Sequence, residues 1–271
     1  MINVRLVMDI LRRDLLYGWM KNKSRYGVFF FLIVTLSFKN IWVLSYQNGT
    51  VLDLFLESFK SSEYLTAIED IGDIPITWIL IHFLILFIIG DFIRDDIKEN
   101  AIYILTRTKR IQEYWLAKLL WIIINVFIMY GLMFLIMYLL GVFFLQPVLE
   151  WGPISKGLLT GALLAETNGL QFLFLLFCLY STTSIVLGFI HLMFTIFISS
   201  QYALLLTLII VCLSIFIDYQ WLPGIHSMLL KHDIFYGTSS LSIQKSFIYN
   251  IVGMVGFGYL GYLFIKRRDM I

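Results

Sequence analysis

Residues 119–145 read LLWIIINVFIMYGLMFLIMYLLGVFFL and contain no aspartate, glutamate, lysine or arginine. A helix needs about 20 mostly apolar residues to cross the hydrocarbon core of a bilayer, so this stretch predicts a membrane-spanning helix. Five further apolar stretches occur, at residues 26–46, 74–93, 170–198, 202–217 and 247–265. Backbone groups cannot stay unpaired in hydrocarbon, so all six are expected to be helical. The predicted fold is an all-α membrane protein with six transmembrane helices.

The composition of the whole chain points the same way. Of its 271 residues, 60% are hydrophobic and 14% charged, which excludes a sizeable soluble domain. The net charge is only +2, and no long basic run occurs, so nucleic acid is not expected as a partner. Cys178 and Cys212 lie inside apolar stretches, where they are expected to pack against neighbouring helices and not to form a disulfide.

The distribution of positive charge predicts the orientation. Fifteen of the twenty lysines and arginines lie before the first span, between the second and third, or after the sixth. Positive residues are retained in the cytoplasm. With an even number of spans, both termini are therefore expected to be cytoplasmic.

The segments on the outer side differ in character. The loop between the first two spans is acidic. Residues 218–246 are too apolar for a solvated loop, and they are predicted to fold back into the outer leaflet as short re-entrant helices covered by protein. Residues 146–169 show the same pattern more weakly.

An amphipathic pattern precedes the first span. On a helical wheel of residues 3–19, the basic side chains Arg5, Arg12 and Arg13 share one arc with Asp9, while most apolar residues and Trp19 lie opposite. Asp14 interrupts the pattern. Residues 1–25 are predicted to form an interfacial helix separate from a six-span domain at residues 26–271. This helix either anchors the N-terminus or also contacts a cytoplasmic partner.

A second amphipathic segment, residues 94–118, joins the second and third spans. Four apolar residues recur at helical spacing and predict a short helix with one apolar face: Ile97, Ala101, Ile104 and Leu105. The first turn of that helix is expected to hold Asp95 and Asp96. Four residues that follow it are predicted to form a collar at the membrane interface: Glu113, Tyr114, Trp115 and Lys118. Either lipid headgroups or another protein must cover the apolar face.

Residues 99–110 read ENAIYILTRTKR. This segment and the layout of the whole chain resemble the permease subunits of ABC-2 type transporters. The resemblance implies six spans after an amphipathic helix, and a cytoplasmic coupling helix that docks on an ATPase subunit. The residues implied to contact the ATPase are Glu99, Leu105, Arg107, Lys109 and Arg110.

The resemblance also implies a function. A bacterial exporter of this kind lies in the cytoplasmic membrane and pairs two permeases, identical or homologous, with two separate ATPase subunits. ATP and Mg²⁺ would be held by those subunits, because this chain has no G-x-x-x-x-G-K-[ST] loop. The chain itself is then not an enzyme and holds no cofactor. The cargo expected from the apolar composition is an amphipathic peptide, a lipid-linked molecule or a hydrophobic drug.

Two other classes stay open. The first is a stand-alone ion-coupled carrier or channel. For an exporter or a carrier alike, the intramembrane polar residues that are candidates to line the substrate path are His82, Tyr180, Thr183 and His191. Each histidine is either a neutral core residue or a ligand or proton carrier, and Tyr180 and Thr183 either line a path or hydrogen-bond to backbone. No Cys, Asp or Glu accompanies the histidines at metal-ligand spacing, so no metal site is predicted. The second class is a lipid-modifying enzyme, in which Asp91, Asp95 and Asp96 would bind Mg²⁺ and a diphosphate.

Overall fold

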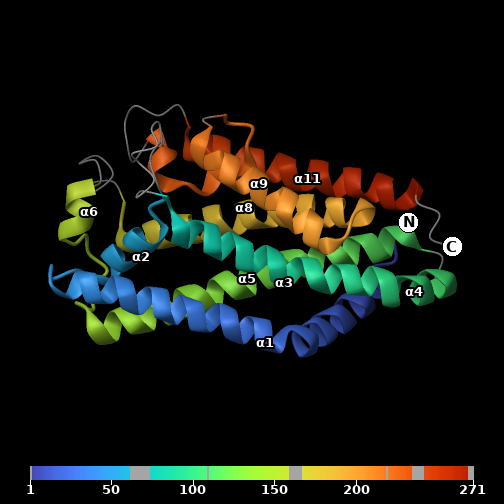
Figure 1. Cartoon of the computed structure of the whole chain (residues 1–271), viewed down its shortest axis with the longest axis horizontal. Coiled ribbons are helices and arrows are strands. Elements are labelled where there is room, and N and C mark those ends of the chain that lie inside the picture. The colour runs from blue at the N-terminus through green and yellow to red at the C-terminus, as the bar shows by residue number, and fades with distance from the viewer. Residues whose placement is uncertain are drawn as a thin grey trace.

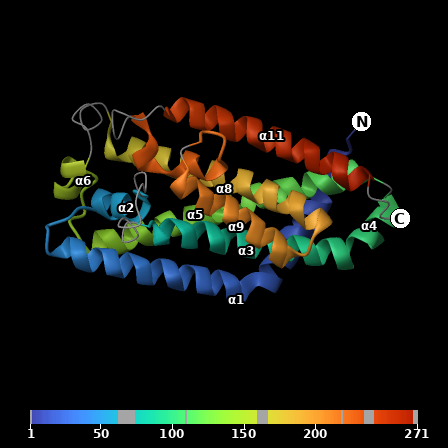
Figure 2. The ribbon, with the colours of Figure 1, turned by 45° about the horizontal axis from the view of Figure 1, so that its top comes forward.

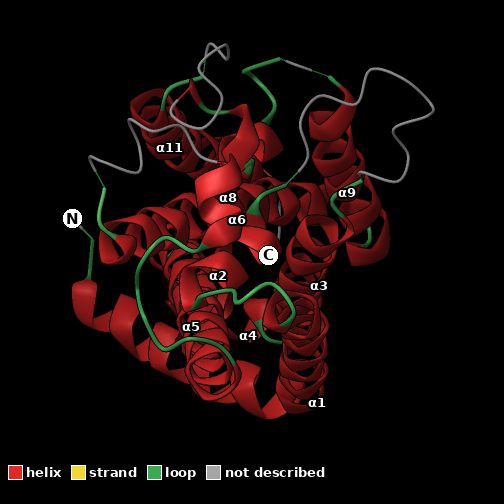
Figure 3. Ribbon diagram, turned by 90° about the vertical axis from the view of Figure 1, so that its left-hand side faces the viewer, coloured by secondary structure: helices red, strands yellow, loops and turns green. Residues whose placement is uncertain are grey.

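The computed structural model describes residues 2–61, 74–108, 110–158, 167–217, 219–233 and 241–267. Within these ranges every regular element is a helix (Figure 3). In chain order the elements are α1 (Val4–Ser45), α2 (Val51–Phe59), α3 (Ile76–Glu99), α4 (Ala101–Thr108), α5 (Ile111–Phe144), α6 (Pro153–Leu158), α8 (Gly169–Phe197), α9 (Ser200–Phe216), the 3₁₀ helices η2 (Pro223–Ser227) and η3 (Leu229–Lys231), and α11 (Ile243–Arg267).

The long helices lie side by side in an elongated bundle (Figures 1 and 2). Five of them, α1, α3, α5, α8 and α11, are long and apolar enough to cross a membrane, which is the architecture of a multi-pass membrane protein. The predicted fifth span coincides with α9, whose 17 residues extend only about 26 Å at 1.5 Å per residue. The all-helical fold is thus confirmed, while a sixth crossing stays a prediction.

The N-terminal segment is continuous with the first span. Helix α1 runs without interruption from Val4 to Ser45 over 42 residues, or about 63 Å, roughly twice the thickness of the hydrocarbon core. Figure 1 shows its first part at an angle to the rest. The predicted boundary between residues 25 and 26 is therefore not a helix boundary. The first part also buries Val7, Ile10 and Leu11, because it packs on this chain as well as facing outward.

The start of α1, the end of α11 and helix α4 all lie at one end of the bundle, and α2 and α6 lie at the opposite end (Figure 1). We call these the α4 end and the α2 end.

The acidic segment after the first span was predicted as a loop, but its first part folds into α2 inside the protein. Thr50 and Asp53 form a capping box at the start of α2. Buried Asp53 also accepts a hydrogen bond of 2.8 Å from the backbone N–H of Ser155 in α6. A carboxylate with such partners tolerates burial, so this charge does not mark a solvated loop.

The segment before α11 is also part of the core. It forms η2 and η3, whose residues are all buried. Trp78, near the start of α3, donates a hydrogen bond of 3.0 Å to Ser227 Oγ in η2. Lys231 Nζ donates to the carbonyl of Ser214 at 2.7 Å, in the last turn of α9. Short helices covered by protein are therefore present here, and their re-entry into a membrane stays a prediction.

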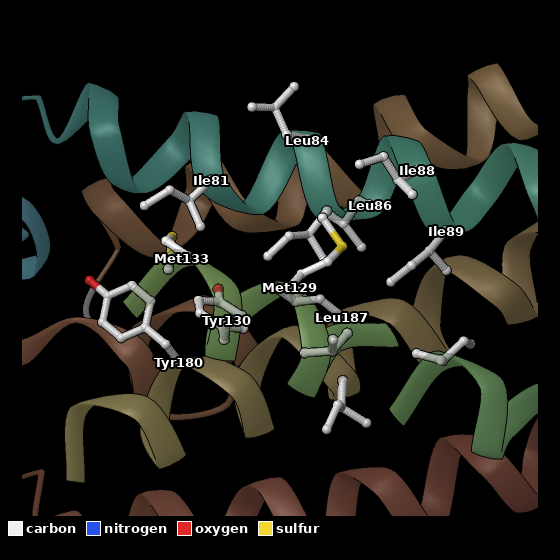
Figure 4. Packing of buried hydrophobic residues seen from close by; sticks show 14 of the residues in the cluster. Ile81, Leu84, Leu86, Ile88, Ile89, Met129, Tyr130, Met133, Tyr180 and Leu187 are labelled. Atoms are coloured by element: carbon white, nitrogen blue, oxygen red, sulfur yellow. The ribbon is translucent and has the colours of Figure 1, made fainter. Parts of the chain in front are cut away.

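The centre of the bundle is formed by α3, α5 and α8. Figure 4 shows Ile81 and Ile89 of α3 facing the methionines of α5 and Leu187 of α8. Some polar groups are buried here too, and the hydroxyls of Tyr130 and Ser184 pair with each other at 2.8 Å. By contrast, α1 and α11 leave most of their apolar surface outside the bundle, where lipid is the expected neighbour.

Candidate functional site

Four charged side chains meet between α1, α3 and α5 near the α4 end: Arg13, Asp14, Asp96 and Lys118. We call this group the charge cluster. Lys118 Nζ lies 2.6 Å from Asp14 Oδ2 and also contacts Asp96. Arg13 Nη2 lies 2.7 Å from Asp96 Oδ1 and also contacts Asp14. The two carboxylates and Lys118 are fully buried, while the Arg13 side chain is 35% exposed. Two positive and two negative charges cancel, which is the condition under which buried charges are tolerated.

Aromatic side chains surround the charge cluster. The Tyr114 hydroxyl donates to Asp96 Oδ2 at 2.9 Å, and Trp121 Nε1 donates to the Asp14 carbonyl at 3.1 Å. The Trp121 ring stacks on Phe92, with 4.2 Å between ring centroids. A Cβ at Gly18 would lie only 3.0 Å from Trp121, so a glycine in α1 allows this close approach. These contacts fix α1, α3 and α5 to one another at this level.

The residues predicted to form an interfacial collar are instead part of this interior. Glu113, Tyr114, Trp115 and Lys118 are all buried. Trp115 Nε1 donates to the carbonyl of Gly258 in α11 at 2.8 Å. Charged and aromatic residues at the end of an apolar stretch resemble a membrane collar in sequence, but here their polar atoms are satisfied by protein.

Helix α4 is attached to the charge cluster at its start and to Glu113 of α5 at its end. Asn100, which precedes it, donates from Nδ2 to Asp96 Oδ1 at 3.1 Å. Arg110, which follows it, lies 2.9 Å from Glu113 Oε1. The same Glu113 oxygen accepts a hydrogen bond of 3.1 Å from the backbone N–H of Asn3 at the start of α1. The two residues that flank α4 therefore bond to α3 and α5, and Glu113 links the α5 attachment to the start of α1.

The position of α4 corrects two sequence predictions. Asp95 and Asp96 lie in the last part of α3, not in the first turn of the connecting helix, because cations of α1 neutralise them and α3 can continue. The apolar face of α4 is covered by this chain itself, since Ala101 and Leu105 are buried in its core. Lipid headgroups or a partner are not needed to cover it. The outward side of α4 carries Tyr103, which is 71% exposed.

The residues predicted to contact an ATPase have different surroundings. Leu105 is buried within the bundle, and the Arg110 side chain is 46% exposed while it pairs with Glu113. Glu99 is the last residue of α3 and Arg107 lies in α4. Lys109 lies outside the described residues. Of the two side chains of this group that the structure describes, Leu105 and Arg110, Arg110 is the exposed one. Tyr103, which was not predicted, is exposed as well.

The predicted interfacial residues divide similarly. Arg5, Arg12 and Trp19 are exposed, as expected of an interfacial helix. Arg13 instead points into the charge cluster. Trp19 stacks on Tyr26, with 5.0 Å between ring centroids.

The three aspartates considered for Mg²⁺ binding each pair with a cation of α1. Besides the Arg13–Asp96 pair, Lys21 lies 2.5 Å from Asp95 and Arg25 lies 2.6 Å from Asp91. These pairs follow one another along the antiparallel α1 and α3. The charges therefore join two helices. Within the described ranges, no group of three or more His, Cys, Asp or Glu residues could hold a metal ion.

Of the four predicted path residues, the structure brings His82 and Tyr180 into contact and places Thr183 and His191 against other helices. The rings of His82 and Tyr180 lie 5.8 Å apart. Thr183 accepts a hydrogen bond from Asn250 of α11 at 3.1 Å, whereas His191 lies against Gly90 of α3. All four are fully buried. A surface pocket of about 490 Å³ is lined by residues of 149–156 and 167–170 and includes none of them.

Sequence reasoning missed the charge cluster as a unit. Its one local signal was Asp14, which interrupts the amphipathic pattern of the N-terminal segment. An acidic residue on the side of a helix that packs against protein needs a buried partner, either a cation or hydrogen-bond donors. Its partner, Lys118, is 104 residues away, so the sequence pattern did not identify it.

The comparisons with known proteins add no relative: no family model, no curated protein and no solved structure matches this chain.

Proposed function

We propose that this chain is the membrane-spanning permease subunit of an ATP-driven exporter and that α4 is its coupling helix. Two permeases, identical or homologous, would work with two separate ATPase subunits in the bacterial cytoplasmic membrane. The α4 end, with both termini, would face the cytoplasm. The cargo class we propose is amphipathic or hydrophobic: a peptide, a lipid-linked molecule or a drug-like compound.

The observation that carries the proposal is the attachment of α4. An eight-residue helix is usually too short to be stable alone, and this one is held by Leu105 in the core and by Asn100 and Arg110 at its two ends. Its outward side remains open at Tyr103. A partner pushing on that side would move a body already fixed to α1, α3 and α5.

The charge cluster supports force transmission for a physical reason. Buried, mutually paired charges resist separation, because pulling one away leaves another unpaired in a medium of low dielectric. A displacement of α4 is therefore expected to move the cytoplasmic ends of three helices together and not to loosen one of them. ATP binding can shift the permease from one conformation to the other only if the ATP-bound ATPase binds the two conformations with different free energies.

The proposal is tested by photo-crosslinking. We would place p-benzoylphenylalanine at Tyr103 in the full chain, expressed in its natural host, and identify adducts by mass spectrometry. The expected adduct contains a polypeptide with a G-x-x-x-x-G-K-[ST] loop. The matched control places the same group at Tyr46, which is 73% exposed near the α2 end and is expected to give no such adduct.

Two outcomes would count against the proposal. One is a Tyr103 position that gives adducts with lipid alone. The other is an identical ATPase adduct from both positions, because the contact would then not be specific to the α4 end. Adducts with lipid alone would make a stand-alone carrier the better assignment.

A further inference from the structure

Two histidines share one serine at the α2 end. Ser246, in the first turn of α11, lies with its Oγ 3.0 Å from His226 Nδ1 and 2.9 Å from His232 Nε2. The three side chains are buried. His226 belongs to η2 and His232 follows η3, so the serine joins the segment before α11 to α11 itself.

The second nitrogen of each ring fixes its tautomer. His226 Nε2 lies 2.9 Å from the carbonyl of Gln220, and His232 Nδ1 lies 2.9 Å from the carbonyl of Met228. A carbonyl only accepts, so each of these nitrogens carries a hydrogen. If both rings are neutral, the two nitrogens that face Ser246 are therefore both acceptors.

Counting hydrogens then leaves one contact incomplete. The hydroxyl of Ser246 has a single hydrogen and can donate to only one of the two rings. The other ring nitrogen would face the serine oxygen with no hydrogen between them. If one ring is an imidazolium, it donates to Ser246 Oγ, and the serine donates to the other ring. One added proton thus satisfies all four contacts.

The counter-charge for that proton comes from the residue that follows one of the two histidines in the sequence. Asp233 directly follows His232, and its Oδ1 atom is buried and accepts no hydrogen bond from the part of the chain that the structure describes. A buried carboxylate oxygen without a donor favours a nearby positive charge. Burial lowers the pKa of His232, and the Asp233 carboxylate acts in the opposite direction. His232 is therefore the ring of the pair that can carry the proton.

A second proton is disfavoured. Burial lowers the pKa of His226 to about 4, with the neighbouring His232 acting in the same direction. The helices packed against η2 contribute little charge: α8 and α9 contain no Asp, Glu, Lys or Arg. On η3, buried Lys231 binds carbonyls of α9, and on α11 Lys245 is exposed. The Tyr249 ring stacks on His226, and its hydroxyl donates to the carbonyl of Trp221.

We infer that His226, Ser246 and His232 form a binding site for a single proton, carried by His232 with Asp233 as its counter-ion. The bound proton closes a continuous chain of hydrogen bonds from the Met228 carbonyl to the Gln220 carbonyl. It thereby fastens the segment at residues 220–232 to the first turn of α11. Loss of the proton removes one of these hydrogen bonds.

Nitrogen NMR of the histidine rings tests the site directly. The full chain, labelled with ¹⁵N-histidine and held in lipid nanodiscs, contains only four histidines, and single His→Gln variants assign them. As the pH is lowered, we expect His232 to become cationic while His226 is still neutral, because burial lowers both pKa values and the Asp233 carboxylate acts in the opposite direction on His232. The inference would be overturned by two rings that stay neutral down to about pH 4, the pKa of His226, or by two rings that become cationic together.

Variants separate proton binding from a merely structural role. Asp233→Asn keeps the size of the side chain and is expected to move the His232 titration to lower pH, because the counter-charge is lost. Ser246→Ala is expected to do the same by removing the acceptor. The control Ser242→Ala removes a serine hydroxyl one turn earlier, which accepts from the Lys245 amide, and it should leave the titration in place. If Ser246→Ala does not fold, the Asp233→Asn result decides alone, and an unchanged titration there would overturn the inference.

Discussion

Lys118 is the residue on which the charge cluster depends, because it contacts both buried carboxylates. Replacing it by alanine leaves Asp14 and Asp96 with a single, partly exposed cation, Arg13. We expect Lys118→Ala to lower the free energy of unfolding by about 3–5 kcal/mol, the range for breaking a buried ion pair. Chemical unfolding of the purified chain in mixed micelles measures the change.

The exposed pair Lys21–Asp95 is the matched control for this experiment. Both side chains are about a third exposed, so solvent screens their attraction. Lys21→Ala is expected to cost no more than about 1 kcal/mol. Equal losses of unfolding free energy from Lys118→Ala and Lys21→Ala would show that the buried charge cluster stabilises the helix interface no more than an exposed pair does.

Gly90 gives a second test at a single position. A Cβ there would lie 2.0 Å from Nε2 of His191, so only glycine lets α3 and α8 approach this closely. Overpacking of this kind costs about 1–3 kcal/mol, and we expect Gly90→Ala to destabilise the chain by that amount. Adding His191→Ala should recover part of the loss in a double-mutant cycle. Gly131→Ala is the control, because a Cβ at that position would have open space within 4 Å.

Helix α4 buries one face in the core, and its other face is the one proposed to dock the ATPase; two substitutions separate these roles. Leu105 is fully buried, so Leu105→Ala should cost about 2–5 kcal/mol of stability. Tyr103 is exposed, so Tyr103→Ala should change stability by no more than about 0.5 kcal/mol, while the amount of ATPase that co-purifies with the chain falls. Unchanged co-purification of an ATPase with Tyr103→Ala would contradict a docking role for this face.

The elements differ in how far the sequence could predict them. The long spans are local signals, because some 20 apolar residues in a row have few alternatives to a transmembrane helix. The ends of α3 and α5 were misread because Asp96 and Lys118 resemble residues at a solvated helix end. What decides their burial is Arg13 and Asp14, far away in the chain, and no periodicity reports such a contact. The same holds for α2, where a partner in α6 makes Asp53 an interior residue.

At the scale of the whole bundle, the point to decide is whether α9 completes a sixth crossing. Its length of about 26 Å is less than the hydrocarbon thickness of about 30 Å. The buried η2 and η3 continue from it on the α2 side, where Lys231 binds its last carbonyls. Protein thus covers the backbone beyond the end of α9, which allows a short helix to complete a crossing.

Cysteine labelling in intact cells decides this point. With Cys178 and Cys212 replaced by alanine, single cysteines would be placed at Trp221, which is 83% exposed after α9, and at Tyr103 on α4. Six crossings predict that a membrane-impermeant maleimide labels Trp221→Cys from outside, and Tyr103→Cys only after the cells are permeabilised. Five crossings would put both positions on one side. With five crossings, α11 would have to cross the membrane in the opposite direction. That direction is incompatible with the contacts that α11 makes with α8 and α5 in the bundle. The labelling of position 221 therefore tests both the packing of the bundle and its orientation in the membrane.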